Sequence, residues 1–241
     1  MPVTCSGRAV KRFYTAVSTE EDHHGFAVLL DGRAIRTPAR RALVAPSEPL
    51  AEAIAAEWRE QGERLDTDAM RLTRLATAAV DLMPTRRDDA VAEAVGYAGT
   101  DLLCYRAVSP QALAVLQAEA WQPWLDWAER QYDARLISAG GVMPAVQDSV
   151  AVRALRTAVE RLDDWRLVGL HAAVTATGSL VLGLAMERGA LTADEAFAAA
   201  ALDELFQIEQ WGEDAEQSAR HERLRADLAA AEQFLRLLSG A

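Results

Sequence analysis

The feature that most constrains this chain is a stretch of twenty residues, from Leu167 to Met186, without a charged side chain. A stretch of that length either spans a bilayer or lies buried inside a folded domain. Three glycines, His171 and three hydroxyl side chains make it a poor membrane span, and its flanks show no basic asymmetry. We therefore expect a helix, at residues 165–188, that is buried in a helical domain without stable membrane insertion.

The N-terminal part favours strands first and helices afterwards. Alternating side chains and turn signals predict strands at residues 11–17, 25–30, 33–37 and 42–45. Asp31-Gly32 favours a tight type I′ hairpin turn, because both of its central positions need φ > 0. Leu50, Ile54 and Trp58 form one apolar stripe of a helix, and a second helix is predicted at residues 72–82.

Beyond Pro84 the pattern is helical. It predicts helices at residues 85–99, 109–132, 147–162, 165–188, 193–211 and 214–238, and a loop at 134–145 with a short strand at 135–137. Residues 1–84 carry 11 basic and 12 acidic side chains, whereas residues 85–241 carry 14 and 24. We therefore expect an α+β fold, with a small β-rich N-terminal domain with helices at 1–84 and an all-helical C-terminal domain at 85–241.

Charge and cysteine content narrow the partners and the compartment. The formal net charge is −11 and no run of Lys or Arg occurs, which argues against nucleic acid as the main partner. Cys5 and Cys104 are far apart in the sequence, so a reducing compartment is the simplest interpretation. The first residues lack the apolar core of a signal peptide. Of the 25 basic residues 24 are arginine, which indicates the GC-rich coding of a bacterium, so together these observations favour the bacterial cytoplasm.

The motifs of common enzymes are mostly absent from the sequence. It contains no G-x-x-x-x-G-K-[ST], no G-x-G-x-x-G and no G-x-S-x-G. His221-Glu222 begins like the zinc motif H-E-x-x-H, but Arg225 replaces the second histidine, so zinc would lose one ligand of its i, i+4 pair. We expect no catalytic residue, no metal site and no cofactor.

The distribution of acids late in the chain is unusual. No basic residue occurs between Arg188 and Arg220. The same window holds acids at Asp194, Glu195, Asp203, Glu204, Glu209, Glu213, Asp214 and Glu216. On a helical projection the apolar residues between positions 197 and 208 cover about half of the helix, with acids at the border. This wide apolar side with its acidic border indicates one of two things. It is either a protein-binding surface that steers a basic partner, or a helix packed on two sides with its acids in solvent. Trp211, followed by Gly212 among acids, is the candidate exposed anchor.

A series of short motifs resembles one known family over nearly the whole chain. The motifs are Lys11-Arg12-Phe13-Tyr14, Leu30-Asp31-Gly32-Arg33, Thr37-Pro38, Glu57-Trp58 with Gln61, Thr100-Asp101, Cys104-Tyr105-Arg106, Gln117, Trp121, Pro123, Trp127-Ala128, Asp203-Glu204, Gln207 and Trp211-Gly212. In this order and spacing they resemble the assembly chaperones of the F-type ATP synthase catalytic head that act on its alpha subunit. Each motif is weak by itself, but the set is specific.

The resemblance implies an ATP-independent, non-enzymatic role. The chaperone would act as a monomer, hold apolar surfaces of the free alpha subunit and yield them to beta subunits. The resemblance implies a family that occurs in the mitochondrial matrix of eukaryotes and in bacteria related to mitochondria. The expected partner-binding residues are Glu204, Phe206, Gln207, Trp211, Glu213, Asp214 and Glu216.

Two alternatives of other classes stay open at this point. One is a small-molecule enzyme with its site in a cleft between the two domains, which would show an acid and a base placed together in a deep polar pocket. The other is a membrane-peripheral protein.

Overall fold

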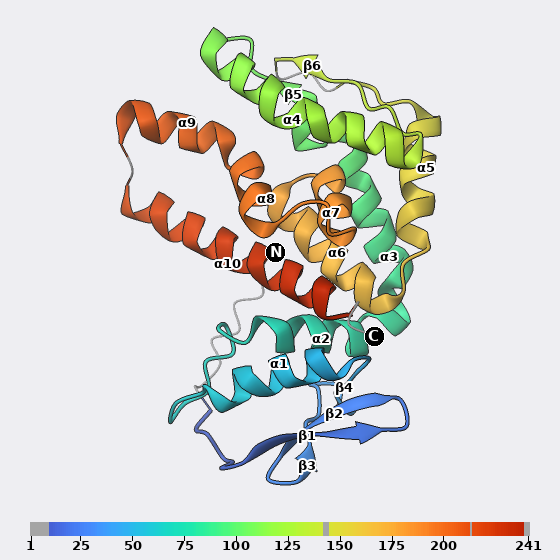
Figure 1. Ribbon diagram of the computed structural model, residues 1–241, viewed down its shortest axis with the longest axis vertical. Coiled ribbons are helices and arrows are strands. Elements are labelled where there is room, and N and C mark those ends of the chain that lie inside the picture. The colour runs from blue at the N-terminus through green and yellow to red at the C-terminus, as the bar shows by residue number, and fades with distance from the viewer. Residues whose placement is uncertain (1–9, 142–144, 213, 239–241) are drawn as a thin grey trace. The chain divides into compact units, whose positions relative to one another are not determined.

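The computed structural model describes residues 10–141, 145–212 and 214–238 (Figure 1). Contacts divide the chain into two compact units, residues 1–84 with 237–241 and residues 85–236. The first unit contains a small sheet and two helices, and the second is mainly helical. The α+β fold class is therefore confirmed, whereas the division into domains at 1–84 and 85–241 stays a prediction.

A small antiparallel sheet is the centre of the first unit. Its strands are β1 (Val17–Asp22), β2 (Gly25–Leu30), β3 (Arg33–Ala34) and β4 (Val44–Ala45), and β2 pairs with the other three. Asp31 and Gly32 have φ of 46° and 76°, as the type I′ prediction requires. Gly25 is required by packing as well as by its φ of 142°, because a Cβ there would lie 2.2 Å from the Ala45 carbonyl oxygen.

The strand expected at residues 11–17 is wrong. Apart from an isolated bridge at Lys11, this segment is held by the helix that follows the sheet, and β1 begins only at Val17. The Tyr14 hydroxyl donates a hydrogen bond of 2.6 Å to the Trp58 carbonyl, and Arg12 Nη1 donates one of 2.5 Å to the Gln61 carbonyl. Long-range side-chain bonds of this kind leave no trace in a local alternation pattern.

Two helices complete the first unit. They are α1 (Glu48–Arg59), which contacts β1 and β2, and α2 (Arg71–Asp81), which contacts α1. Ser47 is the N-cap of α1 and its hydroxyl accepts a hydrogen bond from the Leu50 amide. Val28, Leu50 and Ile54 are fully buried between the sheet and α1 and form much of the apolar core.

The second unit consists mostly of helices. Together with the last part of the chain, its elements are α3 (Met83–Gly96), η1 (Tyr97–Gly99), η2 (Leu102–Cys104), β5 (Tyr105–Arg106), α4 (Gln111–Tyr132), β6 (Ala139–Gly140), α5 (Ser149–Glu160), α6 (Asp164–Thr177), α7 (Leu180–Glu187), α8 (Ala193–Ala200), α9 (Leu202–Trp211) and α10 (Ala215–Leu238). The strand expected at 135–137 is wrong. The strand of this segment is β6, which begins two residues after the expected range and pairs in parallel with β5.

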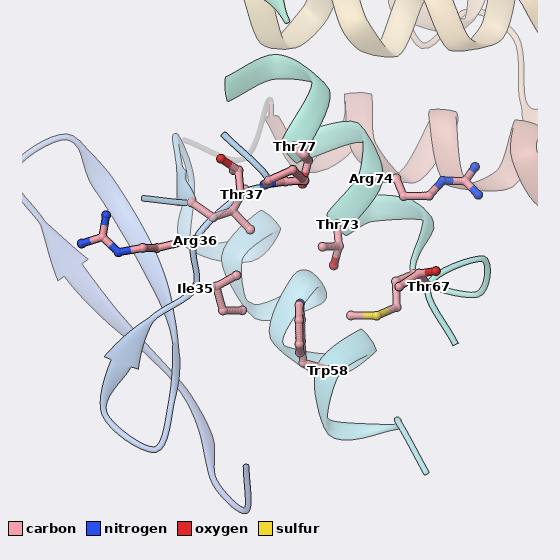
Figure 2. Close-up of a pocket in the computed structure, with 11 residues that line it drawn as sticks. Ile35, Arg36, Thr37, Trp58, Thr67, Thr73, Arg74 and Thr77 are labelled. Carbon is pink, nitrogen blue, oxygen red and sulfur yellow. The ribbon is translucent and has the colours of Figure 1, made fainter. Parts of the chain in front are cut away.

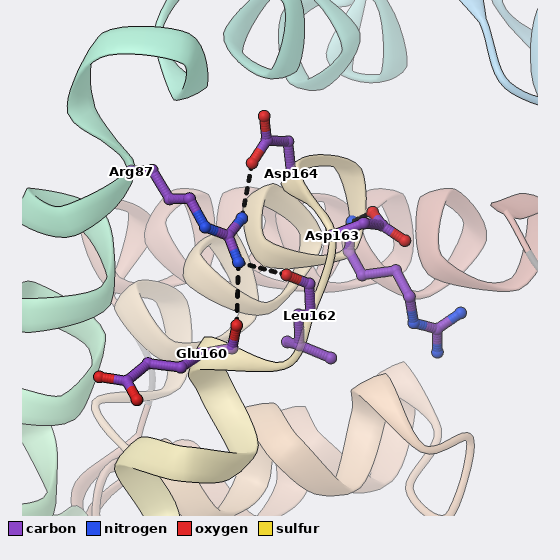
Figure 3. A network of polar contacts seen from close by, with 6 residues as sticks. Arg87, Glu160, Leu162, Asp163 and Asp164 are labelled. Carbon is purple, nitrogen blue, oxygen red and sulfur yellow. Dashed lines mark hydrogen bonds and ion pairs between the residues drawn. The ribbon is translucent and has the colours of Figure 1, made fainter.

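Arg87 of α3 fixes the corner between α5 and α6 (Figure 3). Its Nη1 lies 2.6 Å from Asp164 Oδ1, and its Nη2 donates to the carbonyls of Glu160, at 3.1 Å, and Leu162. Carbonyls at a helix end have no partner within the helix, so one guanidinium supplies several of the missing donors.

The uncharged stretch at residues 167–186 is divided between two helices, α6 and α7. The single helix expected at 165–188 is therefore wrong. Gly178 ends α6 with φ of +69°, and Ser179 then caps α7. Within the described ranges, no helix has both the length and the apolarity to cross a membrane. The helix expected at 193–211 is also divided, because Ala201 leaves helical geometry between α8 and α9.

Candidate partner-binding surface

The first acid of α9 attaches this helix to α4. Asp203 Oδ1 accepts a hydrogen bond of 2.7 Å from Gln117 Nε2, and the Gln117 side-chain oxygen accepts one of 2.6 Å from the Ala107 amide. One turn away on the same helix as Gln117, buried Trp121 donates from Nε1 to the Ala199 carbonyl at 2.9 Å. The end of α8 and the start of α9 are therefore attached to α4 by polar contacts.

The second acid attaches α9 to α10. Glu204 Oε2 lies 2.6 Å from His221 Nε2 and 2.5 Å from Arg220 Nη2. The His221 side chain is buried, and the edge of Phe197 meets its ring with centroids 5.4 Å apart. Glu204 was expected to orient a partner, and in this structure it pairs with two side chains of its own protein.

The rest of α9 lies open. None of its residues is buried, although it contains four aliphatic or aromatic side chains before Trp211, at Leu202, Leu205, Phe206 and Ile208. All four are half-buried, and Trp211 is 80% exposed. Exposed apolar surface of this kind, on a helix fixed at its other end, is typical of a protein-binding surface.

Three of the expected residues line one hollow where α9 is followed by α10. Gln207, Asp214 and Glu216 surround a cavity of about 360 Å³, together with Gln217, Arg220 and Arg223 of α10. The Asp214 carboxylate also accepts a hydrogen bond of 2.8 Å from the Gln217 amide, which starts α10. Glu213 lies outside the described residues.

The structure thus groups most of the predicted residues without testing their role. We name the partly exposed side chains of α9, together with this hollow, the α9 surface: Leu202, Leu205, Phe206, Gln207, Ile208, Trp211, Asp214 and Glu216. Sequence reasoning missed the arginines of the hollow, Arg220 and Arg223, although their i, i+3 spacing places both on one face of a helix. In the part of the chain that the structure describes, no group of three His, Cys, Asp or Glu residues is placed to hold a metal ion.

Comparisons with known proteins agree on one family. Residues 11–129 match the family model described as ATP12 chaperone protein. The mitochondrial protein atp12 of Schizosaccharomyces pombe is 24% identical over 218 residues, which cover 84% of this chain and 74% of that protein.

Two solved structures are similar over nearly the whole length. The crystal structure of Atp12 from Paracoccus denitrificans is 43% identical, with a TM-score of 0.89 and coverage of 95% of this chain and 98% of that one. A protein from Agrobacterium tumefaciens is 38% identical, with a TM-score of 0.90 and coverage of 95% and 86%.

Proposed function

Because the chain belongs to the ATP12 chaperone family, we propose that it is an assembly chaperone that holds the free alpha subunit of the F-type ATP synthase catalytic head. It acts without ATP and without catalysis, and it yields the subunit to beta subunits. It acts as a monomer in the bacterial cytoplasm. The family supports the chaperone role, and the resemblance of the sequence motifs supports the choice of the alpha subunit.

The exposure of Trp211 is the observation on which the proposed contact depends. An indole that is 80% exposed at the end of a helix with no buried residue has no packing role. Tryptophan is enriched among the residues that contribute most to protein–protein binding. Trp211 and Phe206 therefore supply the apolar contact, and Gln207 at the rim supplies hydrogen bonds.

Acids around this apolar contact set the direction of approach. Asp214 and Glu216 are exposed beside the hollow, and the sequence between Arg188 and Arg220 has no basic residue. Arg220 and Arg223 of α10 line the other part of the hollow. Charges at the rim of an interface act mainly on the association rate. Glu204 acts indirectly, because its bonds to α10 hold the α9 surface in place. A standard patch of roughly 800 Å² per partner would be displaced by a larger interface with beta subunits.

The test is suppression of alpha-subunit aggregation, measured by light scattering after dilution from denaturant. We expect the unmodified protein to keep the subunit soluble and Trp211→Ala to lose most of this activity. Val150→Ala is the control, because Val150 of α5 is an apolar side chain that is 56% exposed and lies outside the α9 surface. Equal suppression by both variants would remove the α9 surface as the contact.

A second measurement tests the acids. Glu216→Lys should slow association with the alpha subunit, and the difference from the unmodified protein should shrink as salt is added. Phosphate release or turnover of a small molecule in the same assay would instead favour the enzyme alternative.

A further inference from the structure

The first unit contains an apolar hollow that the proposed function does not use. It has a volume of about 460 Å³ and lies between the segment after β3, the last turn of α1 and the start of α2. Its wall includes Ile35, Leu43, Trp58 and Met70. Figure 2 shows Ile35, Trp58 and Thr73 around one space, with Arg36 and Arg74 on opposite sides of it and turned outward.

A second hollow continues the first. It has a volume of about 570 Å³ and shares Ile35, Arg36 and Trp58 with its neighbour. Its far end is formed by Phe13, a 67% exposed ring, and Tyr14. The two hollows adjoin at these three shared residues, and we name them together the Trp58 groove.

Contacts among the lining residues and behind them fix the walls of the groove. The ring of Tyr14 lies 5.6 Å from that of Trp58, and its hydroxyl donates to the Trp58 carbonyl. On the other side, the Glu57 carboxylate accepts hydrogen bonds from the amides of Leu72, at 2.7 Å, and Thr73, at 2.8 Å. This carboxylate caps the start of α2 from another helix, so the side chains that line the groove come from elements fixed to each other.

The rim of the groove is basic in a chain whose net charge is −11. Arg33, Arg36 and Arg74 line it and are exposed. Arg74 Nη1 lies 4.0 Å from the exposed Asp68 carboxylate, and Arg36 Nη1 donates a hydrogen bond of 2.9 Å to the Arg40 carbonyl, so Arg33 and Arg36 carry most of the unpaired charge. The acid that lines the rim, Asp31, accepts hydrogen bonds from the Thr15 amide and hydroxyl and from the Ala16 amide. These bonds hold the pKa of Asp31 below its ordinary value, so Asp31 keeps its negative charge and offsets one of the three arginines. The charge that complements this rim is negative.

We propose that the Trp58 groove binds an extended polypeptide segment in which apolar side chains alternate with acidic ones. Every second side chain of an extended segment points to the same side, about 7 Å apart, so two apolar side chains enter the two hollows. The acidic residues between and beside them meet the outward-turned arginines. This site is distinct from the α9 surface. It binds an acidic segment, whereas the acids of the α9 surface steer a basic partner. The proposal does not require that the bound segment belongs to the alpha subunit.

The two adjoining hollows of the groove favour a polypeptide over a small molecule. A compact ligand fills one hollow, whereas a chain occupies both and places its charges at the rim. Trp58 Nε1 is buried and meets no acceptor. An unpaired buried donor costs about 1–3 kcal/mol. A small rotation of the ring would let a bound peptide carbonyl accept from it.

The experiment measures the fluorescence anisotropy of a labelled peptide with the full-length chain. The probe alternates glutamate with leucine and phenylalanine, and the matched peptide has lysine in place of glutamate. We expect the acidic peptide to bind at least about tenfold more tightly than the basic one, since each 1.4 kcal/mol is a factor of ten. Equal binding of both peptides, or binding of neither, would overturn the proposal.

Two variants test the groove by different means. Thr77→Phe fills the first hollow, and Arg36→Glu with Arg74→Glu reverses the rim. Each should weaken the acidic peptide by about tenfold or more. Arg135→Glu with Arg153→Glu is the charge-matched control and should leave its affinity unchanged, because both arginines are exposed in the other unit. Circular dichroism establishes that each variant is folded. Unchanged affinity in both groove variants would show that the peptide binds elsewhere.

Two further arms separate the possible outcomes. Decanoate, an apolar carboxylate, tests the small-molecule alternative: binding of decanoate without binding of the peptide contradicts a polypeptide occupant. Trp211→Ala should bind the acidic peptide normally while failing to protect the alpha subunit. Failure of the groove proposal would therefore leave the proposed function intact, and the reverse also holds.

Discussion

Two apolar helices of the second unit have opposite environments. Every residue of α7 is buried, whereas no residue of α9 is. The charged residue of α7, Glu187, has a side chain that is only 3% exposed and lies 2.6 Å from Arg166. The first two acids of α9 also find partners, Asp203 on α4 and Glu204 on α10. Apolar content alone therefore does not decide burial; an unpaired apolar face next to paired acids marks a surface kept open for a partner.

The sharpest test of this contrast is the same substitution in both helices. Leu182→Ala in α7 removes a fully buried side chain and should lower the free energy of unfolding by about 3 kcal/mol. Leu205→Ala in α9 removes a half-buried one and should cost roughly 1 kcal/mol. Urea unfolding measures both values. Equal costs would mean that α9 is packed as tightly as α7 in solution.

The ion pairs of the two helices extend the comparison. Arg166→Ala leaves the buried Glu187 carboxylate with only Arg188, 3.6 Å away, so we expect a loss of about 2–3 kcal/mol. Arg220→Ala should cost less than about 1 kcal/mol, because the pair is partly exposed and Glu204 keeps His221. The same unfolding measurements apply. A larger loss for Arg220→Ala than for Arg166→Ala would contradict the order of burial.

A buried acid at the start of α7 makes a pH-dependent contribution. Asp101 accepts hydrogen bonds from the amides of Leu103 and Val181, yet burial raises its pKa to about 6 from an ordinary value of 3.8. The folded protein binds this proton more strongly than the unfolded chain between these two values. Asp101 therefore stabilises the fold at low pH, and that stabilisation is lost as the pH rises towards 6 and above.

The variant that tests this contribution is Asp101→Asn, because the asparagine side chain does not ionise. Relative to it, the free energy of unfolding of the unmodified protein should fall by up to about 3 kcal/mol between pH 4 and pH 7. Urea unfolding at several pH values gives the two curves. Parallel curves would show that Asp101 ionises in the fold as easily as in the unfolded chain.

Local geometry in this fold could be predicted from sequence, and long-range pairing could not. Asp31-Gly32 predicted its turn because both positions have positive φ as a local property. The break at Gly178 was missed because the flanking apolar residues continue a helical pattern through it. The pairing of β5 with β6 was missed because two-residue strands have no periodicity.

The candidate site divides in the same way. The exposure of Trp211 was predictable from its place among acids at a helix end. The bond from Glu204 to His221 was not, because it depends on α10 folding back along α9, and no spacing in the sequence predicts that. The interpretation of Glu204 as a solvent-facing acid therefore changed once the helices were in place, while that of Trp211 did not.

The smallest expected effect on stability belongs to the residue with the largest expected effect on binding. Trp211→Ala removes a side chain that is 80% exposed, so it should change the free energy of unfolding by no more than about 0.5 kcal/mol. Trp121→Ala, at a ring only 1% exposed, should cost about 3–5 kcal/mol. A loss above about 1.5 kcal/mol for Trp211→Ala would mean that its indole packs against the protein. The α9 surface would then be closed in the free chaperone, and a partner would have to open it before binding.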